Sequence, residues 1–350
     1  MSDRINTNED SNILLEVKNL KVYFPVYAGI LQRKVADVKA VDDISFTINR
    51  GETLGLVGES GCGKTTVGRA VINILKHVSP DVHISGEVNY FDESGKKTNL
   101  AALGTRDMRG FRSKIQMIFQ DPFSSLNARL SVKQIVAEPL EIHQPNLGAK
   151  EIDDRVSWLL EKVGLQPEYA ARYPHEFSGG QRQRIGIARA LSTNPDLIIC
   201  DEPVSALDVS VQAQVINLME DLRDEFKMSY LFIAHDLSVV YHISQRIAVM
   251  YLGNMVEIGT NDQVYFNASH PYTRALLSAL PIPDPHRTDK KRIVLQGDIP
   301  TPMNKPSGCS FRTRCPIAQP SCAEAIPPLL IQSDGRFVAC PFVEKAKLEM

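Results

Sequence analysis

The chain has 350 residues, a formal net charge of −2 and a hydrophobic content of 43%, an ordinary balance for a globular protein. It lacks the basic field that duplex-binding proteins carry, so we expect no nucleic-acid partner. The first residues, MSDRINTNEDSN, have no apolar core of a signal peptide, and no apolar run is long enough to span a bilayer. Any work at a membrane would therefore be that of a peripheral subunit.

The N-terminal residues predict an antiparallel sheet. Residues 13–24 alternate apolar and polar side chains as a half-buried strand does, and residues 41–49 resume strand character. The segment between them, residues 26–38, is basic and shows little periodicity, so we expect a solvated loop there.

Residues 53–67, TLGLVGESGCGKTTV, predict a phosphate-binding loop. A short apolar strand breaks at a glycine and a helical pattern follows, which is the context that G-x-x-x-x-G-K-[ST] requires. Glycines let backbone N–H groups approach an anion, and the helix N-terminus faces it. Lys64 supplies a charge for the β- and γ-phosphates, and Thr65 a hydroxyl for Mg²⁺. A chance glycine-rich turn would leave the lysine and threonine unexplained. The candidate nucleotide-binding residues are Gly58, Glu59, Ser60, Gly61, Cys62, Gly63, Lys64, Thr65 and Thr66.

An aromatic pair, Tyr23 and Phe24, ends the first predicted strand. Either ring could stack on the adenine of a bound nucleotide, and either could equally belong to the core. The sequence does not decide between them.

The middle of the chain predicts two more strands and then helices. Residues 86–92 predict a strand, and residues 114–120 predict an apolar strand that ends on Gln120 before a turn-rich loop. Residues 131–142 and 151–165 place apolar side chains three and four apart, as amphipathic helices do.

A second anion-binding helix start is predicted at Ser178-Gly179-Gly180-Gln181. The helix that follows extends to Leu191, and its N-terminal N–H groups would face an anion. A simple N-cap explains Ser178 but leaves the paired glycines unexplained.

Two further apolar strands end on residues suited to phosphate chemistry. Residues 197–200 lead into Asp201 and Glu202, and residues 230–234 lead into His235. Ligands of open α/β sheets bind at the carboxyl ends of the strands. Asp201 suits Mg²⁺, and Glu202 suits polarising a water for attack on the γ-phosphate. Solvated turn carboxylates and a structural histidine are the alternatives, but Gln120, Glu202 and His235 all terminate apolar strands and are expected to cluster around one phosphate.

These motifs, in this order, resemble the ATP-binding-cassette (ABC) ATPases over residues 12–265. The chain carries the Walker A motif GESGCGKTT, the Q-loop Gln120, the signature FSGGQ, the Walker B motif LIICDEP, the D-loop 205–208 and the switch histidine His235. The one departure is Phe177, where the signature usually begins with Leu. The resemblance implies an α/β fold: a P-loop NTPase (RecA-like) core with an antiparallel β subdomain and an α-helical signature subdomain at about 121–190.

A closer resemblance, to the oligopeptide/dipeptide importer subfamily, is carried by QMIFQDPFSSLN, by HPYTRALLSALP and by a cysteine-bearing tail. It implies a small C-terminal extension over residues 266–350. It also implies ATP and Mg²⁺ as cofactors, with Thr65, Gln120 and Asp201 at the magnesium ion, and Asp208 and the signature residues Ser178–Gln181 at the nucleotide of a head-to-tail ATPase dimer. Glu202 would be the catalytic carboxylate, assisted by Gln120 and His235.

The partners that the resemblance implies are a second ABC ATPase subunit, commonly a paralogue, two transmembrane permease subunits and an extracytoplasmic substrate-binding protein. The location would be the cytoplasmic face of the inner membrane. Import of another solute, such as an oligosaccharide, nickel or an opine, is the alternative. A soluble cassette ATPase of DNA repair or translation is a second alternative, but it lacks support in the sequence because no long heptad insertion and no second cassette is visible.

The tail after residue 281 begins with a Pro- and charge-rich linker and then contains Cys309, Cys315, Cys322 and Cys340. Without a secretory signal, a disulfide framework is not expected. Structural zinc usually shows closer cysteine pairs, although zinc and free thiols stay open. Tails of this subfamily are similar to ones that hold a [4Fe–4S] cluster, so we expect a cluster here. Arg312 and Arg314 could offset the thiolate charge.

Overall fold

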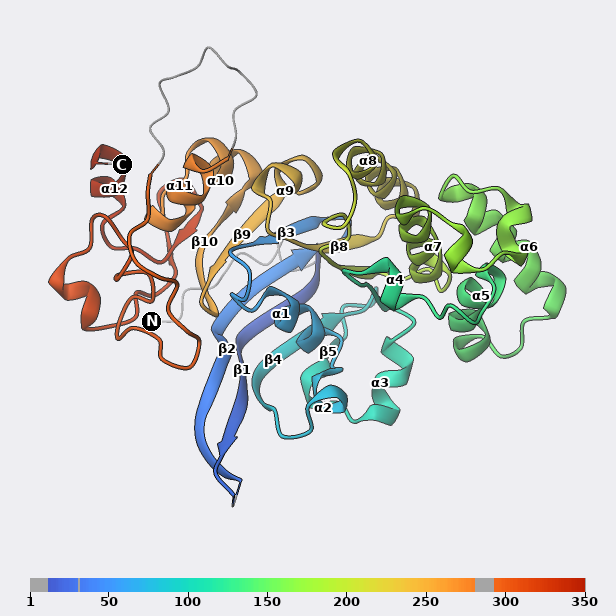
Figure 1. Ribbon diagram of the computed structural model, residues 1–350, viewed down its shortest axis with the longest axis horizontal. Coiled ribbons are helices and arrows are strands. Elements are labelled where there is room, and N and C mark those ends of the chain that lie inside the picture. The colour runs from blue at the N-terminus through green and yellow to red at the C-terminus, as the bar shows by residue number, and fades with distance from the viewer. Residues whose placement is uncertain (1–11, 31, 281–292, 350) are drawn as a thin grey trace, which may run out of the picture. The chain divides into compact units, whose positions relative to one another are not determined.

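The computed structural model describes residues 12–30, 32–280 and 293–349 (Figure 1), and its chain forms two compact units. Of the described residues, unit 1 comprises those of 12–15, Thr47–Thr53 and Tyr90–Ala234. Unit 2 comprises the described residues within Glu16–Phe46, Leu54–Asn89 and 235–349. Because the long N-terminal strands contribute to both units, each unit is assembled from segments far apart in the sequence.

Unit 1 is built on three parallel strands in the order β8-β7-β6. Every residue of β7 and β8 is buried, which explains their near-continuous apolar sequences. The strands are β5 (Lys97–Asn99), β6 (Ile115–Ile118), β7 (Leu197–Asp201) and β8 (Ser229–Ala234). The α-helices are α3 (Thr105–Phe111), α4 (Pro122–Ser125), α5 (Val132–His143), α6 (Ala149–Lys162), α7 (Gly179–Leu191) and α8 (Val209–Phe226), and 3₁₀ turns lie at Leu100–Ala102, Pro167–Ala171 and Pro174–Glu176.

The helical part of unit 1 agrees with the predicted periodicity. A capping box at Ser131 and Gln134 starts α5, and Gly164, with φ of +71°, follows α6. Helix α7 packs against α4, α5 and α6, as the green elements of Figure 1 show. Its N-terminus is thereby held on a packed group of helices rather than on an isolated loop.

Unit 2 contains a mixed sheet in which β3 pairs in parallel with β9, and β9, β10 and β12 pair antiparallel. Strands β2, β1 and β4 are neighbours in a separate sheet. The strands are β1 (Ile13–Ala28), β2 (Arg33–Asn49), β3 (Thr53–Val57), β4 (His83–Phe91), β9 (Arg246–Tyr251), β10 (Asn254–Thr260), β11 (Leu330–Ile331) and β12 (Phe337–Val338). The helices are α1 (Lys64–Val71), α2 (Leu75–Val78), α9 (Leu237–Ile243), α10 (Asn261–Phe266), α11 (Pro271–Ser278) and α12 (Val343–Glu349), with a 3₁₀ turn at Pro320–Ala323.

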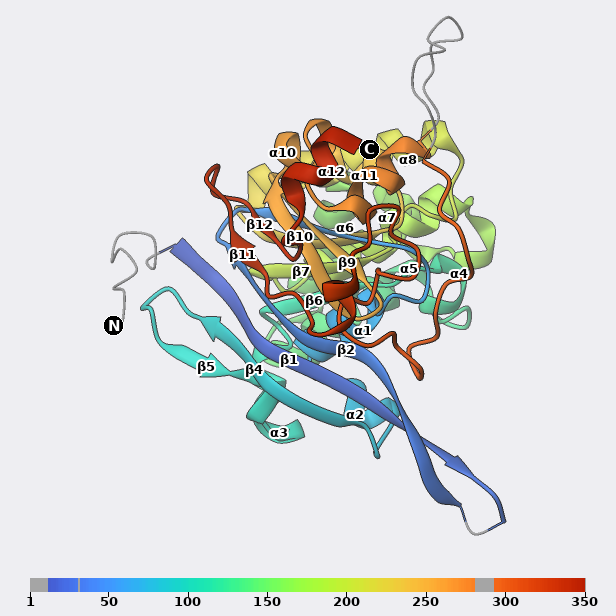
Figure 2. The same ribbon diagram turned by 90° about the vertical axis from the view of Figure 1, so that its left-hand side faces the viewer.

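The loop predicted at residues 26–38 is wrong at both ends. β1 continues to Ala28 and β2 begins at Arg33, and the two run side by side as long strands (Figure 2). The connection between them is short because β1 ends at Ala28 and β2 begins at Arg33. The Gln32 N–H donates to the Gly29 carbonyl at 3.2 Å. Two neighbouring strands satisfy each other's backbone groups without an alternating sequence, which is why periodicity missed this ribbon.

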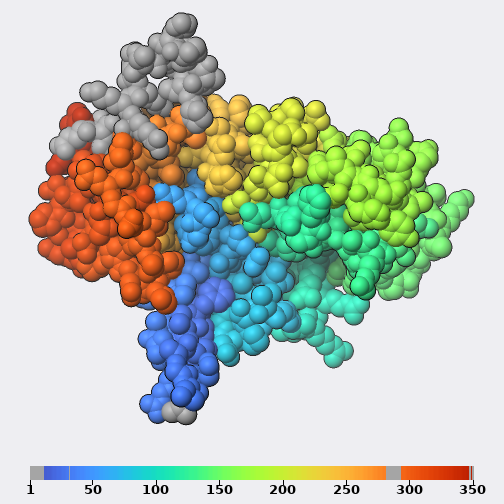
Figure 3. All heavy atoms as spheres, viewed as in Figure 1, coloured from blue at the N-terminus to red at the C-terminus, as the bar shows by residue number. Residues whose placement is uncertain are grey.

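The C-terminal extension packs within unit 2. Lys305 pairs with Asp42 of β2 at 3.1 Å, and the Lys39 N–H donates to the Pro302 carbonyl. Phe311 and Val338 are each only 1% exposed, so the extension contributes to the core. In Figure 3 its orange atoms adjoin the blue atoms of the N-terminal third of the chain. Among the described residues, no helix combines the length and apolar content needed to cross a membrane.

Candidate functional site

The phosphate loop joins β3 to α1 in unit 2. Gly63 precedes the helix with φ of +106°, and a Cβ there would lie 2.1 Å from the Ala40 carbonyl oxygen. A side chain at this position would meet both backbone strain and a backbone atom. Ser60 and Gly61 are exposed, whereas Cys62 is buried. The local geometry is that of the predicted loop, with its outer residues open to a ligand.

Lys64 lies inside this loop. Its side chain is buried, and Nζ donates to the carbonyl oxygens of Gly58 at 2.8 Å and Glu59 at 3.1 Å. Nζ also lies 3.9 Å from Cys62 Sγ, and a buried ammonium with neutral partners interacts strongly with an anion. Thr65 and Thr66 follow it in the first turn of α1. The loop therefore presents a cation and a helix N-terminus together, as phosphate binding requires.

Three residues remote in sequence support the loop, and sequence reasoning gave none of them a role there. The Glu59 N–H donates to the Tyr272 hydroxyl at 2.9 Å, and Arg314 forms an ion pair with the Glu59 carboxylate at 2.8 Å. The Gly253 N–H donates to the Cys62 carbonyl. The sequence HPYTRALL drew attention to Tyr272 only as a family marker; the structure shows its hydroxyl bonded to the loop backbone.

His270 explains how Tyr272 is oriented. The imidazole Nδ1 accepts the Tyr272 N–H at 3.1 Å and caps α11. Burial lowers the pKa of His270 to about 3, so the ring is neutral and can accept this bond. The buried carboxylate of Glu257 accepts the N–H groups of Ser269 and His270, which fixes the start of the helix that carries Tyr272.

The two aromatic candidates for adenine stacking lie within β1 rather than at its end. The Tyr23 hydroxyl donates to Asp42, and the ammonium of Lys39 lies 5.6 Å from the ring centroid. Burial and the hydrogen bond to Asp42 raise the pKa of Tyr23. Phe24 is half-buried. Stacking by either ring stays a prediction.

In unit 1, the strand β7 ends on Asp201, which is 2% exposed. Glu202 follows with φ of +47°, and its N–H donates to the Ile233 carbonyl at 2.9 Å. Strained backbone of this kind is common at functional sites. Gln120, two residues beyond β6, donates from Nε2 to Glu202 Oε2 at 3.0 Å. Two of the three residues predicted to share one phosphate are therefore in contact.

His235 follows β8 directly and belongs to unit 2. Its side chain is exposed. Asp236, the next residue, caps α9 by accepting the Ser238 N–H at 2.8 Å. The predicted clustering of His235 with the other two residues stays a prediction.

The start of α7 is a capping box. Ser178 Oγ accepts the Gln181 N–H at 3.3 Å, and Gln181 Oε1 accepts the Ser178 N–H at 3.0 Å. The second glycine has a packing reason, since a Cβ on Gly180 would lie 2.5 Å from Val211 Cγ1. Capping explains Ser178, and packing against Val211 explains Gly180. Gly179 is half-exposed beside the capped N–H groups.

Asp208 has a similar local role at α8. Its Oδ1 accepts the Val211 N–H at 3.0 Å and the Ser210 hydroxyl at 2.7 Å. These bonds, the Ser210 hydroxyl first, lower the pKa of Asp208. The carboxylate is therefore held in a fixed, ionised form at the helix start.

Curated relatives match the chain over nearly its whole length. It is 52% identical over 336 residues to the oligopeptide transport ATP-binding protein AppF of Bacillus subtilis, covering 95% of this chain and 98% of that protein. It is 53% identical over 324 residues to the oligopeptide transport ATP-binding protein OppF of Escherichia coli, covering 92% and 94%. A family model described as "ABC transporter" matches residues 41–205, and one described as "Oligopeptide/dipeptide transporter, C-terminal region" matches residues 256–322. The chain belongs to the ABC transporter family.

Within that family it is an ABC ATPase related to the oligopeptide and dipeptide transport ATP-binding proteins. A solved ATP-binding cassette, a dimer in a post-hydrolysis state with ADP and Pi, superposes with a TM-score of 0.59 at 26% identity, covering 71% of this chain and 99% of that one. The cbiO1 protein of Clostridium perfringens gives the same TM-score at 24% identity over 73% and 92%. These likenesses confirm the predicted P-loop fold. ATP and Mg²⁺ are the ligands expected of such an ATPase.

The cysteine tail of this ABC ATPase does not confirm the expected metal site. Within the described ranges, no group of three or more His, Cys, Asp or Glu side chains is arranged to hold a metal ion. All six cysteines are free. The four tail cysteines nevertheless line one cavity of about 20 Å³ together with Phe311, which is room for about one water molecule. These four cysteines are Cys309, Cys315, Cys322 and Cys340.

Two of the thiols in this cavity, Cys315 and Cys340, favour the protonated form. Burial, with the neighbouring thiols, raises the pKa of Cys315 to about 12 and that of Cys340 to about 11. A metal would have to displace these protons. The donor set fits a thiolate-bound centre, but the cavity would need to widen before it could hold a cluster.

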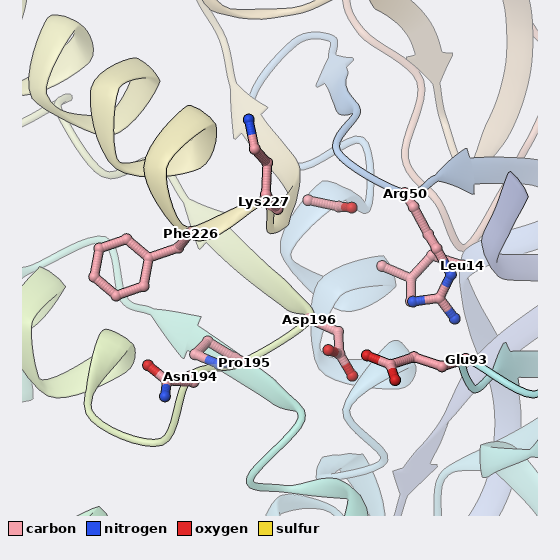
Figure 4. Close-up of a pocket in the computed structure, with 9 residues that line it drawn as sticks. Leu14, Arg50, Glu93, Asn194, Pro195, Asp196, Phe226 and Lys227 are labelled. Carbon is pink, nitrogen blue, oxygen red and sulfur yellow. The ribbon is translucent and has the colours of Figure 1, made fainter.

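A second cavity, of about 590 Å³, lies in unit 1. Figure 4 shows Arg50, Glu93 and Asp196 with their charged ends directed toward the same space. Asp196 accepts a hydrogen bond from Tyr90, and Arg50 donates to the Phe91 carbonyl. None of the predicted nucleotide-binding residues lines it, so we assign it no part in ATP chemistry.

Proposed function

We propose that the chain is the ATP-hydrolysing motor subunit of an importer for oligopeptides or dipeptides. The observation that carries the proposal is about 50% identity over more than nine-tenths of the chain to several peptide transport ATP-binding proteins. The match extends through the C-terminal region, where the family model is that of oligopeptide/dipeptide transporters. The peptide transport relatives, rather than this region alone, favour peptides over an oligosaccharide, nickel or an opine.

We infer the following roles in ATP hydrolysis. Lys64 binds the β- and γ-phosphates, and Thr65 and Asp201 bind Mg²⁺. Glu202 accepts a proton from the attacking water, because its carboxylate is held by Gln120 Nε2 and by a constrained backbone. We propose that three further residues contact the bound nucleotide: His235, Asp208 and one aromatic of the Tyr23–Phe24 pair.

We propose that ATP is bound between two ATPase subunits. The relative solved with ADP and Pi is a dimer, and the capped N-terminus of α7 offers N–H donors to a phosphate. Closing two subunits on a nucleotide excludes water, which strengthens the stabilisation of the transferring phosphoryl group. The remaining partners are two transmembrane permease subunits and an extracytoplasmic substrate-binding protein, with this chain at the cytoplasmic face of the inner membrane.

The test is reconstitution of the complex in vesicles with the subunits that co-purify with this chain. Peptide delivered by the binding protein should stimulate ATP hydrolysis and enter the vesicle lumen. If a sugar or nickel stimulates ATP hydrolysis and peptides do not, the transported solute is not a peptide. Purification of an active ATPase with no membrane subunit would favour a soluble role.

We also infer that the four tail cysteines hold a [4Fe–4S] cluster with a structural role, with zinc as the alternative that needs less widening of the cavity. Four thiols that face one cavity support a thiolate-bound centre. Such a centre would join parts of an extension that has few regular elements. Protein purified without oxygen should contain about four iron and four sulfide per chain. One zinc without iron would overturn the cluster, and reduced thiols free of metal would overturn both.

A further inference from the structure

The C-terminal extension contributes a cation to the phosphate loop. Arg314 Nη1 donates to Glu59 Oε2 at 2.8 Å, and Nη2 donates to Oε1 at 3.2 Å. The Arg314 side chain is 9% exposed and that of Glu59 21%. Two parallel bonds of this kind fix direction as well as distance. The pair is largely withdrawn from solvent, so it is not one of the surface ion pairs that contribute little.

The charge of Glu59 opposes the function of the loop that carries it. Its carboxylate is attached to the backbone that would surround a triphosphate, and like charges at short range repel. The Lys64 ammonium is shared with the neighbouring carbonyl oxygens rather than paired with this carboxylate. Neutralisation of Glu59 therefore comes from Arg314.

The extension holds Arg314 in place. Its Nη1 also lies 3.5 Å from the Tyr251 hydroxyl. The nearby Phe311 ring packs against Tyr251 and Tyr272, with centroids 5.3 Å and 5.4 Å apart. A guanidinium stays protonated in proteins, so Arg314 is a cation held on a packed segment.

We propose that Arg314 is a positioning residue of the ATP site, which pairs with the Glu59 carboxylate so that the loop does not repel the triphosphate. The same pair steadies the residue whose carbonyl oxygen holds Lys64. The inference rests on the proposed function in taking this loop as the ATP site. It gives the C-terminal extension a part in nucleotide affinity that is separate from any metal its cysteines bind.

The experiment measures the dissociation constant of ATP, by calorimetry on the full chain, for a double-mutant cycle. Arg314→Gln should weaken ATP binding roughly tenfold, the loss expected when one unit charge near the phosphates is left unpaired. Glu59→Gln leaves the Arg314 guanidinium without its carboxylate and should bind ATP more tightly than the wild type. The double variant should recover most of the affinity, since no uncompensated carboxylate remains.

Arg312→Gln is the matched control. This arginine lies two residues away and donates to the carbonyl and hydroxyl oxygens of Ser307, so its loss should leave the affinity for ATP unchanged. Arg314→Lys keeps the charge and should keep most of the affinity, and it serves if the glutamine variant fails to fold. In steady-state kinetics, KM for ATP should rise more than kcat falls.

Two results would overturn the inference: an Arg314→Gln protein that binds ATP as the wild type does, or a double variant as weak as Arg314→Gln. The second would mean that Arg314 acts only through the fold of the extension. Failure of the wild-type chain to bind ATP would instead overturn the proposed function together with this inference.

Discussion

The hydroxyl of Tyr272 offers a test of how the loop is supported. Tyr272→Phe removes the oxygen that accepts the Glu59 N–H at 2.9 Å. The ring itself is fully buried and should stay in place, because its contacts with Tyr251, at 4.6 Å between centroids, and with Phe311 do not involve the hydroxyl. The variant therefore isolates one hydrogen bond, between Tyr272 of the C-terminal extension and the phosphate loop.

The expected cost follows from leaving one backbone donor without its acceptor. A buried donor that loses its acceptor costs about 1–3 kcal/mol. The phenylalanine ring that replaces the phenol has no polar group that would need a partner. Since the Glu59 residue is partly exposed, water can recover some of this, so we expect about 1–2 kcal/mol. That corresponds to roughly 5- to 30-fold more frequent opening of the loop.

Hydrogen exchange measures this opening directly. The amide hydrogen of Glu59, followed in a proteolytic fragment that covers the phosphate loop, should exchange roughly 5- to 30-fold faster in Tyr272→Phe than in the wild type. Tyr241→Phe is the control, because the Tyr241 hydroxyl donates to Asp262 on the surface at 3.2 Å. An unchanged exchange rate at Glu59 would refute the role given to Tyr272.

Three further predictions use the same loop and its support. Lys64→Ala should weaken ATP binding at least tenfold in a calorimetric titration, because a charge-assisted contact to the phosphates is lost; unchanged affinity would count against the loop as the ATP site. Gly63→Ala should lower the thermal midpoint, since the new Cβ would lie 2.1 Å from a carbonyl oxygen at φ of +106°, and a midpoint equal to the wild type would contradict that geometry. His270 has its pKa lowered to about 3 by burial, below its unfolded value near 6.5. It therefore contributes stability above pH 6.5 that is lost as the pH falls toward 3. His270→Asn, which keeps a capping oxygen, should flatten the fall in unfolding free energy between about pH 6 and pH 4, and an unaltered slope would exclude His270 as its source.

The motifs could be predicted because the residues that each one needs lie close together in the sequence. The phosphate loop needs a strand, glycines, a lysine and a helix start within fifteen residues, and the structure has each where the pattern places it. The contact of Gln120 with Glu202 could be anticipated because both follow parallel strands that pair side by side. Strand ends of a parallel sheet bring distant residues to one edge.

The support of the loop could not be predicted in this way. The hydrogen bond from Glu59 to Tyr272 joins residues 213 positions apart, and the bond from Arg314 spans 255. No local periodicity carries such a pairing. Arg312 and Arg314 look equivalent beside the cysteines, and only the fold separates one that bonds to Ser307 from one that pairs with Glu59. The sequence predicts the inner parts of β1 and β2 but not their outer ends, residues 25–28 and 33–40, because neighbouring strands can satisfy each other's backbone groups without an alternating pattern.

The most direct test of the account is ATP turnover by Glu202→Gln in the reconstituted complex. The variant should bind ATP with the affinity of the wild type, because Glu202 is assigned to the attacking water and not to the phosphates. Hydrolysis should fall about 10²- to 10⁴-fold, the usual contribution of a general base. Hydrolysis at the wild-type rate, with ATP bound normally, would contradict the central claim.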